Sequence, residues 1–234
     1  MHGRISPRVL IGVAVVVIVG FAAAYFLLFG DDSPPPLTLG AAPSTVAGEA
    51  AATTDVAGVW TVASGSEAGY RVREQLVGLS APGDAVGRTP AVSGQVQVSQ
   101  AGDGIVASDA RFEVDLRELK SDKDRRDTFI KTQGLESNQF PMATFVATEP
   151  VRLSDEPPVG QVVKVTSVGD LTLHGVTKRV SIPIDARLAG NQIELVGSLK
   201  FPMSDFDIEP PRAASVVSIE SDATLEFRLL LQKG

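Results

Sequence analysis

The chain of 234 residues has no cysteine and only two histidines. Without cysteine it can form no disulfide and has no thiol to which a lipid could be attached. His2 lies at the start of the chain, so His174 is the only histidine available elsewhere. A single histidine without cysteine cannot build a typical zinc site. The sequence therefore predicts no metal and no cofactor.

Positive charge is also in short supply, with 21 lysines and arginines against 28 acidic residues and a net charge of −7. This balance argues against nucleic-acid binding and against tight docking on anionic headgroups. No phosphate loop or dinucleotide fingerprint follows any expected strand. Asp122, Asp124 and Asp127 lack the glycine and distal glutamate of a calcium loop, and acids at a helix start explain their spacing. We therefore expect no enzyme.

One long hydrophobic run, residues 9–29, contains no charged residue. As a helix it would span about 31 Å, close to the thickness of a bilayer core. The run is longer than the apolar part of a secretory signal, which favours an uncleaved transmembrane anchor. Ala22, Ala23 and Ala24 leave cleavage open as the alternative.

Charges on either side of this run predict its orientation. Arg4 and Arg8 precede it, whereas Asp31 and Asp32 follow it. Because positive residues stay on the cytoplasmic side, residues 1–8 are expected in the cytoplasm and the rest of the chain outside it. The expected location is therefore the cell membrane, with a single span and an extracytoplasmic C-terminal domain.

Residues 31–57 hold four prolines and no aromatic side chain. A segment of this composition cannot bury a core and is typical of a Pro/Ala-rich flexible linker. The folded domain is expected to occupy residues 58–234, beginning near Val59 and Trp60.

Beyond the linker, apolar residues recur at every second position. Ala110, Phe112 and Val114 share one face of a run whose other face is charged, and runs at 180–188 and 225–229 repeat the pattern. Such alternation predicts antiparallel strands with one dry face. Closing about eight of them into a barrel would remove exposed edges. The alternation is broken at 121–133, where a capping arrangement of Ser121 and Asp124, acids at the start and a glycine just past the end predict one short helix.

His174 could serve a Ser–His–Asp mechanism, but it follows an apolar strand and precedes Gly175. This position is typical of a tight turn in which the ring hydrogen-bonds to local backbone. We therefore interpret His174 and Gly175 as a structural turn.

Four stretches of the chain resemble the YceI family of exported, lipocalin-like proteins. The most specific are "DLTLHGVTKRVSIPI" (170–184) and "DKDRRDTFIKTQGLESNQFPMATF" (122–145). "VWTVASGSEAGYRVRE" (59–74) is similar to the opening strand pair of the family, and "LKFPMSDFDI" (199–208) to a late strand and loop. The chain departs from the family at Gly65 and Glu74, where histidines are usual.

The resemblance implies a closed antiparallel barrel around an apolar cavity that binds a long isoprenoid or another lipid tail. The expected function is thus a membrane-anchored extracytoplasmic protein that holds or carries such a lipid. The alternative is a tethered, non-catalytic interaction module with a solid barrel core, whose protein partners the sequence does not indicate. The residues expected to line the cavity are Tyr70, Phe112, Val114, Leu171, Leu173, Ile182, Ile184 and Phe227.

Overall fold

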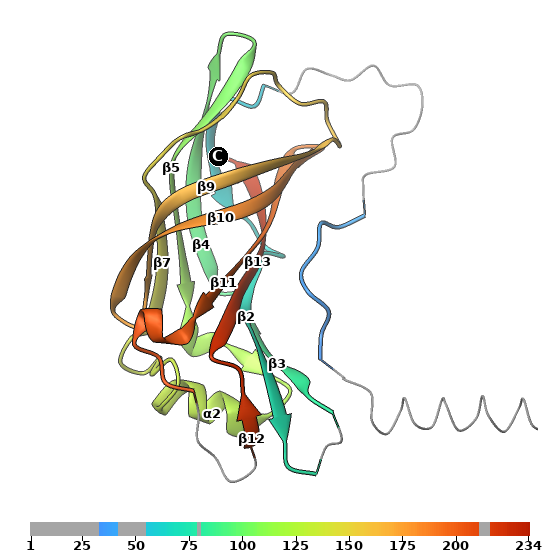
Figure 1. The fold of residues 1–234 in the computed structure, drawn as a ribbon. Helices are drawn as coiled ribbons and strands as arrows, with labels where there is room; N and C mark the ends of the chain where they lie inside the picture. The colour runs from blue at the N-terminus through green and yellow to red at the C-terminus, as the bar shows by residue number, and fades with distance from the viewer. Residues whose placement is uncertain (1–32, 42–54, 79–80, 211–215) are drawn as a thin grey trace, which may run out of the picture.

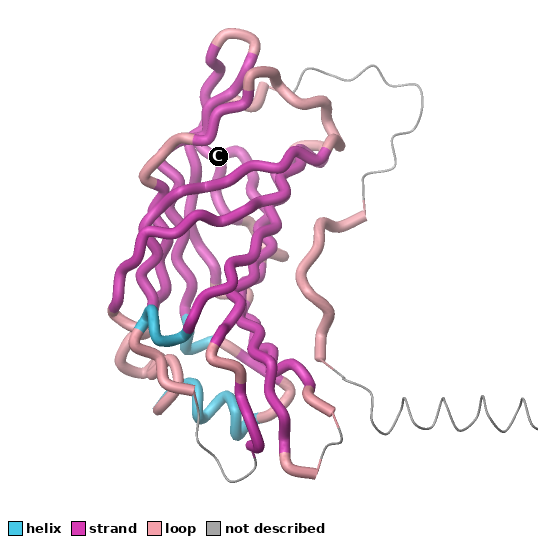
Figure 2. The backbone as a smooth tube through the Cα atoms, in the orientation of Figure 1, coloured by secondary structure: helices cyan, strands magenta, loops and turns pink. Residues whose placement is uncertain are grey.

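The computed structural model describes residues 33–41, 55–78, 81–210 and 216–234, and these form one antiparallel sheet of thirteen strands (Figures 1 and 2). Within these ranges there is one α-helix, α2 (Asp124–Thr132), and there are two short 3-10 helices, at Leu116–Glu118 and Met203–Phe206. The strands are β1 (Gly58–Val62), β2 (Glu67–Leu76), β3 (Gly83–Thr89), β4 (Val92–Ala101), β5 (Gly104–Asp115), β6 (Lys120–Ser121), β7 (Met142–Ala147), β8 (Val151–Leu153), β9 (Val162–Leu173), β10 (Val176–Ala189), β11 (Gln192–Pro202), β12 (Val216–Ile219) and β13 (Asp222–Lys233).

Eight of the strands close into a barrel. Neighbours around the ring run β1, β4, β5, β7, β9, β10, β11 and β13, and β13 pairs again with β1. Closure leaves no free edge within the ring. The predicted all-β closed barrel of about eight strands with one helix is confirmed.

Strands β2, β3, β6 and β12 extend the wall at the end of the barrel near α2, whereas β8 pairs with the first residues of β5 towards the other end (Figure 1). The end of β13 pairs with β1, whereas its first half pairs with β2, which continues into β3 and β6. Between β1 and β2 the chain turns at Gly65, whose φ is +89°. The buried Ser66 fastens this turn, because its Oγ accepts a hydrogen bond of 2.9 Å from Leu230 N.

The buried core lies in two clusters. Near α2 it includes Leu116, Phe201 and Phe206, and Phe201 and Phe206 pack edge to face with ring centroids 5.1 Å apart. Towards the other end it includes Trp60 and Leu231, both almost fully buried. Members of both clusters line the interior of the barrel.

Helix α2 lies across one end of the barrel (Figure 1). The expected cap at Ser121 is not formed, because Ser121 belongs to β6 and the helix begins only at Asp124. Instead Asp127 reaches back, and its Oδ1 accepts hydrogen bonds from Ser121 N (2.9 Å) and Ser121 Oγ (2.7 Å). This buried carboxylate joins the helix to the sheet.

The expected cytoplasmic segment 1–8 and transmembrane run 9–29 lie outside the described residues. Within the described part of the chain, no helix is long and apolar enough to cross a membrane.

Residues 33–41, which we call the strap, fall within the segment expected to be a flexible linker. The structure instead holds them in an extended conformation beside the outer wall of the barrel, where they form the blue trace of Figure 1. Composition predicts flexibility here because the strap has little to bury, but its backbone carbonyls are held by arginines of the barrel.

Candidate functional site

A cavity of about 320 Å³ occupies the interior of the barrel. Its volume is many times what a single water needs and lies within the range of ligand pockets. It is lined by residues of the barrel strands, of β2 and of α2. All eight residues expected to line a cavity lie on its wall, namely Tyr70, Phe112, Val114, Leu171, Leu173, Ile182, Ile184 and Phe227.

The burial pattern of β13 shows that the inside of the barrel is not filled. Phe227 points into the cavity and is only partly buried, whereas its neighbour Glu226 faces outward and is 3% exposed. If the barrel were close-packed inside, the inward ring of Phe227 would be more buried than the outward side chain of Glu226. The partly exposed ring of Phe227 therefore borders open space inside the barrel, which favours a cavity over a solid core.

Glycines opposite the aromatic residues keep the cavity open. Tyr70 pairs across the sheet with Gly87, and Phe227 pairs with Gly197. A Cβ added to Gly87 would lie 2.3 Å from the Tyr70 ring, and one added to Gly197 would lie 2.4 Å from the Phe227 ring. Each ring thus takes the place of the missing side chain and lies against the sheet, which leaves the lumen free.

The end of the cavity near α2 carries a polar cluster formed by Tyr70, Glu74 and Arg126. Arg126 makes ion pairs with both Glu74 and Asp122. The hydroxyl of Tyr70 is buried and has no hydrogen-bond partner. Glu74 and Arg126 were not among the predicted site residues, although the alternation of β2 places Glu74 on the same inward face as Tyr70.

Burial raises the pKa of the Tyr70 phenol well above its usual value, and Asp127 and Glu74 add to this effect. The charge of Arg126 acts in the opposite direction but is outweighed. Burial also opposes the charged form of Arg126, yet the charge of Glu74 and its hydrogen bond leave the pKa of Arg126 raised. At neutral pH the phenol is therefore a neutral donor beside a permanent ion pair.

His174 lies outside the cavity wall, in the two-residue turn between β9 and β10. His174 and Gly175 both have positive φ, at 51° and 75°, as the tight hairpin turn requires. The ring Nδ1 lies 3.0 Å from the carbonyl oxygen of Phe206, and Nε2 lies 2.9 Å from Glu136 Oε2. The predicted turn is present, but the prediction of local backbone partners was wrong, because both contacts reach distant segments.

A YceI-like domain model matches residues 60–231. The chain belongs to the YceI family. A UPF0312 protein of Vibrio vulnificus (strain YJ016) is 30% identical over 141 residues, which make up 57% of this chain and 70% of that relative. A UPF0312 protein of Vibrio parahaemolyticus is 31% identical over 123 residues, covering 50% of this chain and 61% of the relative.

Solved structures share the YceI fold at low sequence identity. A polyisoprenoid binding domain from Saccharophagus degradans aligns with a TM-score of 0.58 and 18% identity, covering 76% of this chain and 99% of that domain. The YceI protein of Campylobacter jejuni aligns with a TM-score of 0.51 and 15% identity, covering 63% and 84% of the two chains. These likenesses show the fold.

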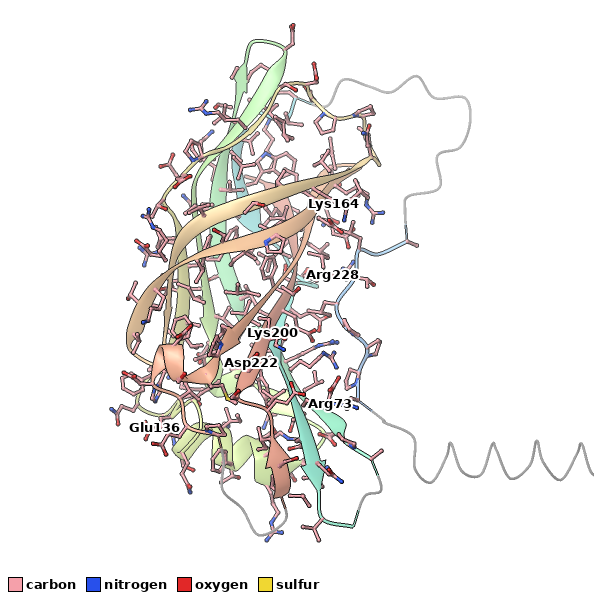
Figure 3. The ribbon with its side chains drawn as sticks, in the orientation of Figure 1. Arg73, Glu136, Lys164, Lys200, Asp222 and Arg228 are labelled. Carbon is pink, nitrogen blue, oxygen red and sulfur yellow. The ribbon has the colours of Figure 1, made fainter. Side chains whose placement is uncertain are left out.

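On the outside of this YceI barrel, the strap covers two buried carboxylates. Glu226 accepts a hydrogen bond from Arg88 (2.8 Å), and Glu194 accepts one from Arg228 (2.7 Å) and pairs with Arg187. In Figure 3 Arg228 lies on the flank of the barrel that faces the strap. Neither carboxylate borders the cavity, and of their partners named here only Arg187 also lies on its wall.

The arginines of this outer face bind the strap through its backbone. Carbonyl oxygens of Pro34 and Gly40 accept hydrogen bonds from Arg71 (2.7 Å) and Arg187 (2.8 Å), and Gly40 N–H donates to Glu194 at 2.8 Å. Burial would raise the pKa of Glu194, but the hydrogen bonds from Gly40, Arg228 and Arg187 outweigh it and lower that pKa.

Among the described residues no group of histidine, aspartate and glutamate side chains is arranged to hold a metal ion. The polar cluster of the lumen contains a phenol, a carboxylate and a guanidinium already paired with it. This arrangement can donate a hydrogen bond into an apolar space, and it offers no nucleophile positioned by a base.

Proposed function

We propose that this protein holds or carries a long apolar lipid, of isoprenoid type, inside its barrel. The observation that carries the proposal is a cavity of about 320 Å³ whose wall is aliphatic and aromatic along almost its whole extent. Each methylene group that a lipid tail buries there contributes about 0.8 kcal/mol. The polyisoprenoid binding domain of S. degradans, which shares the fold, supports the same ligand class.

The length of the lined space favours a chain over a compact ligand. Wall residues include Val56 and Leu231, which belong to the core cluster around Trp60, and Phe129 and Ile208 at the end near α2. A narrow apolar space that reaches from one core cluster to the other matches the shape of a single extended hydrocarbon chain. Residues 9–29 would anchor the protein in the membrane from which such a lipid is drawn, with the barrel outside the cytoplasm.

Thermal melts of delipidated protein with and without a long polyprenol test this proposal. A ligand that binds only the folded state at 100 times its Kd stabilises it by about 2.7 kcal/mol, so the melting temperature should rise with lipid concentration. The matched variant is Ile184→Trp, which places an indole in the space that the tail would occupy. The variant should keep its melting temperature without lipid and lose most of the response to it.

The opposite pattern would contradict the proposal. If the wild-type melting temperature ignores the polyprenol and Ile184→Trp is destabilised by about 1–3 kcal/mol, as expected of overpacking in a filled core, the cavity is not a lipid site.

A further inference from the structure

The polar end of the cavity contains a hydrogen-bond donor that the protein itself does not use. The hydroxyl of Tyr70 is buried on the cavity wall and has no partner, although buried hydroxyls are normally satisfied. The ring is fixed against Gly87, so the hydroxyl cannot simply turn away to find one. Leaving such a group unpaired is unfavourable, and a ligand oxygen that accepts its hydrogen bond would remove that cost.

Among the described residues that line the cavity, each positively charged side chain is paired with a carboxylate. They are Arg126, which pairs with Glu74 and Asp122, and Arg187, which pairs with Glu194. No lysine lies among the described residues that line the wall, whereas three glutamates do, namely Glu74, Glu156 and Glu209. An anionic group entering the lumen would therefore lose its hydration and meet carboxylates rather than a free cation.

We propose that the cavity selects an uncharged long-chain lipid whose terminal oxygen accepts a hydrogen bond from Tyr70, and that it rejects the phosphorylated form of the same chain. The inference rests on the proposed function and defines the ligand class more narrowly. An alcohol fits both partners at this end, because its oxygen accepts from Tyr70 and its hydroxyl can donate to Glu74.

Two ligands that differ only in their heads test the inference on the full-length protein in detergent. The probes are a polyprenol and its monophosphate of equal chain length. Binding is followed by the thermal shift of Trp60 fluorescence, since Trp60 is the single tryptophan and is buried in the barrel. We expect the polyprenol to bind at least about tenfold more tightly. Equal or tighter binding of the phosphate would overturn the inference and leave the proposed function standing, whereas no binding of either lipid would overturn both.

Substitutions at the polar end identify the groups responsible. Tyr70→Phe should weaken polyprenol binding about tenfold while leaving the lipid-free melting temperature unchanged or higher, because an unpaired buried hydroxyl is removed. A purely structural role of Tyr70 would instead lower the melting temperature and leave affinity unchanged, which would contradict the inference.

Glu74→Gln should raise the affinity for the monophosphate about tenfold, since it frees part of the charge of Arg126. The matched control is Glu113→Gln, a carboxylate that pairs with Arg111 on the outer face of β5. The control should leave both affinities unchanged. Unaltered selectivity in a folded Glu74→Gln variant would contradict the charge argument, and the wild-type comparison of the two lipids decides the matter even if that variant does not fold.

Discussion

His174 joins three segments of the fold that lie far apart in the sequence. Its ring connects the β9–β10 turn to the carbonyl of Phe206 and to Glu136, and it packs edge to face on Phe140 at 4.6 Å. Glu136, at the same end of the barrel as α2, is labelled in Figure 3. His174 and Glu136 both have left-handed backbone conformations, which cost energy for residues other than glycine and persist only where contacts enforce them.

Replacing His174 by alanine should therefore destabilise the protein without removing lipid binding. Two hydrogen bonds and an aromatic contact are lost at a largely buried side chain, so we expect a fall of about 1–3 kcal/mol in the free energy of unfolding. Urea titration measures this change, and the polyprenol-induced thermal shift measures binding. Loss of binding in a variant that remains folded would show that His174 acts on the ligand.

The buried phenol of Tyr70 leads us to expect that the free energy of unfolding falls at alkaline pH. Burial raises its folded-state pKa, so its contribution is fully present below the unfolded-state pKa of about 10 and is lost as the pH rises above that value. The free energy of unfolding should fall by up to about 1.4 kcal/mol per pH unit above pH 10. Urea titrations between pH 8 and 11 test this, with Tyr70→Phe as control. Parallel curves for wild type and variant would contradict the prediction.

The sequence predicts which residues face inward more reliably than it predicts what they contact. Side chains alternate between the two faces of a strand because of its backbone geometry. Phe112, Ile184 and Phe227 could therefore be assigned to the inward face without a structure. The partners of His174 come from segments more than thirty residues away, and no local pattern reports them. Glu74 lay on the predicted inner face, but its pairing with Arg126 depends on where α2 packs.

Among the elements, the strap departs most from expectation. Its own residues bury little, yet its backbone completes the hydrogen bonding of a charged outer face that includes Arg71, Arg187 and Glu194. The composition of a segment indicates how much apolar surface it can bury. It does not indicate whether its backbone groups form hydrogen bonds with side chains from other parts of the chain. Such contacts therefore have to be read from the structure.

Glu194→Gln should release the strap and destabilise the barrel. It leaves Arg187 and Arg228 without their carboxylate, and breaking a buried ion pair in this way costs about 3–5 kcal/mol. Hydrogen exchange of the Gly40 amide reports the strap directly and should become fast in the variant. Exchange that remains slow would show that the strap is held by other contacts.

The ion pairs of Glu194 also lead us to expect that the free energy of unfolding falls at acid pH. The lowered pKa of Glu194 contributes stability above its unfolded-state value of about 4.3, and this contribution is lost as the pH falls through the lower folded-state pKa. Wild type should therefore lose stability below about pH 4.5, and Glu194→Gln should lack this component. Glu113→Gln, on an exposed pair, should behave as wild type.

Glycines in the strands determine the width of the lumen. Gly197→Ala places a Cβ 2.4 Å from the Phe227 ring, which must then turn into the cavity. We expect a loss of about 1–3 kcal/mol from overpacking and about a tenfold loss of polyprenol affinity. Ser198→Ala, on the outer face of the same strand, is the matched control. Unchanged affinity in Gly197→Ala would show that the ring does not border the occupied space.

At the scale of the whole molecule, eight strands suffice to enclose a space that side chains could have filled. This barrel leaves the space open because the rings of Tyr70 and Phe227 lie against glycines of the neighbouring strands. The closed all-β fold followed from alternation and from the YceI resemblance. The cavity itself could not be derived from alternation, since an apolar inner face predicts a packed core and an open lumen equally well.

Mass spectrometry of an organic extract tests the central claim most directly. Full-length protein is purified in mild detergent from the cells that express it and is extracted beside the Ile184→Trp variant prepared in the same way. The account predicts that the wild type releases an uncharged long-chain isoprenoid in near-equimolar amount and that the variant releases far less. Equal traces of bulk membrane lipid from both proteins would contradict it.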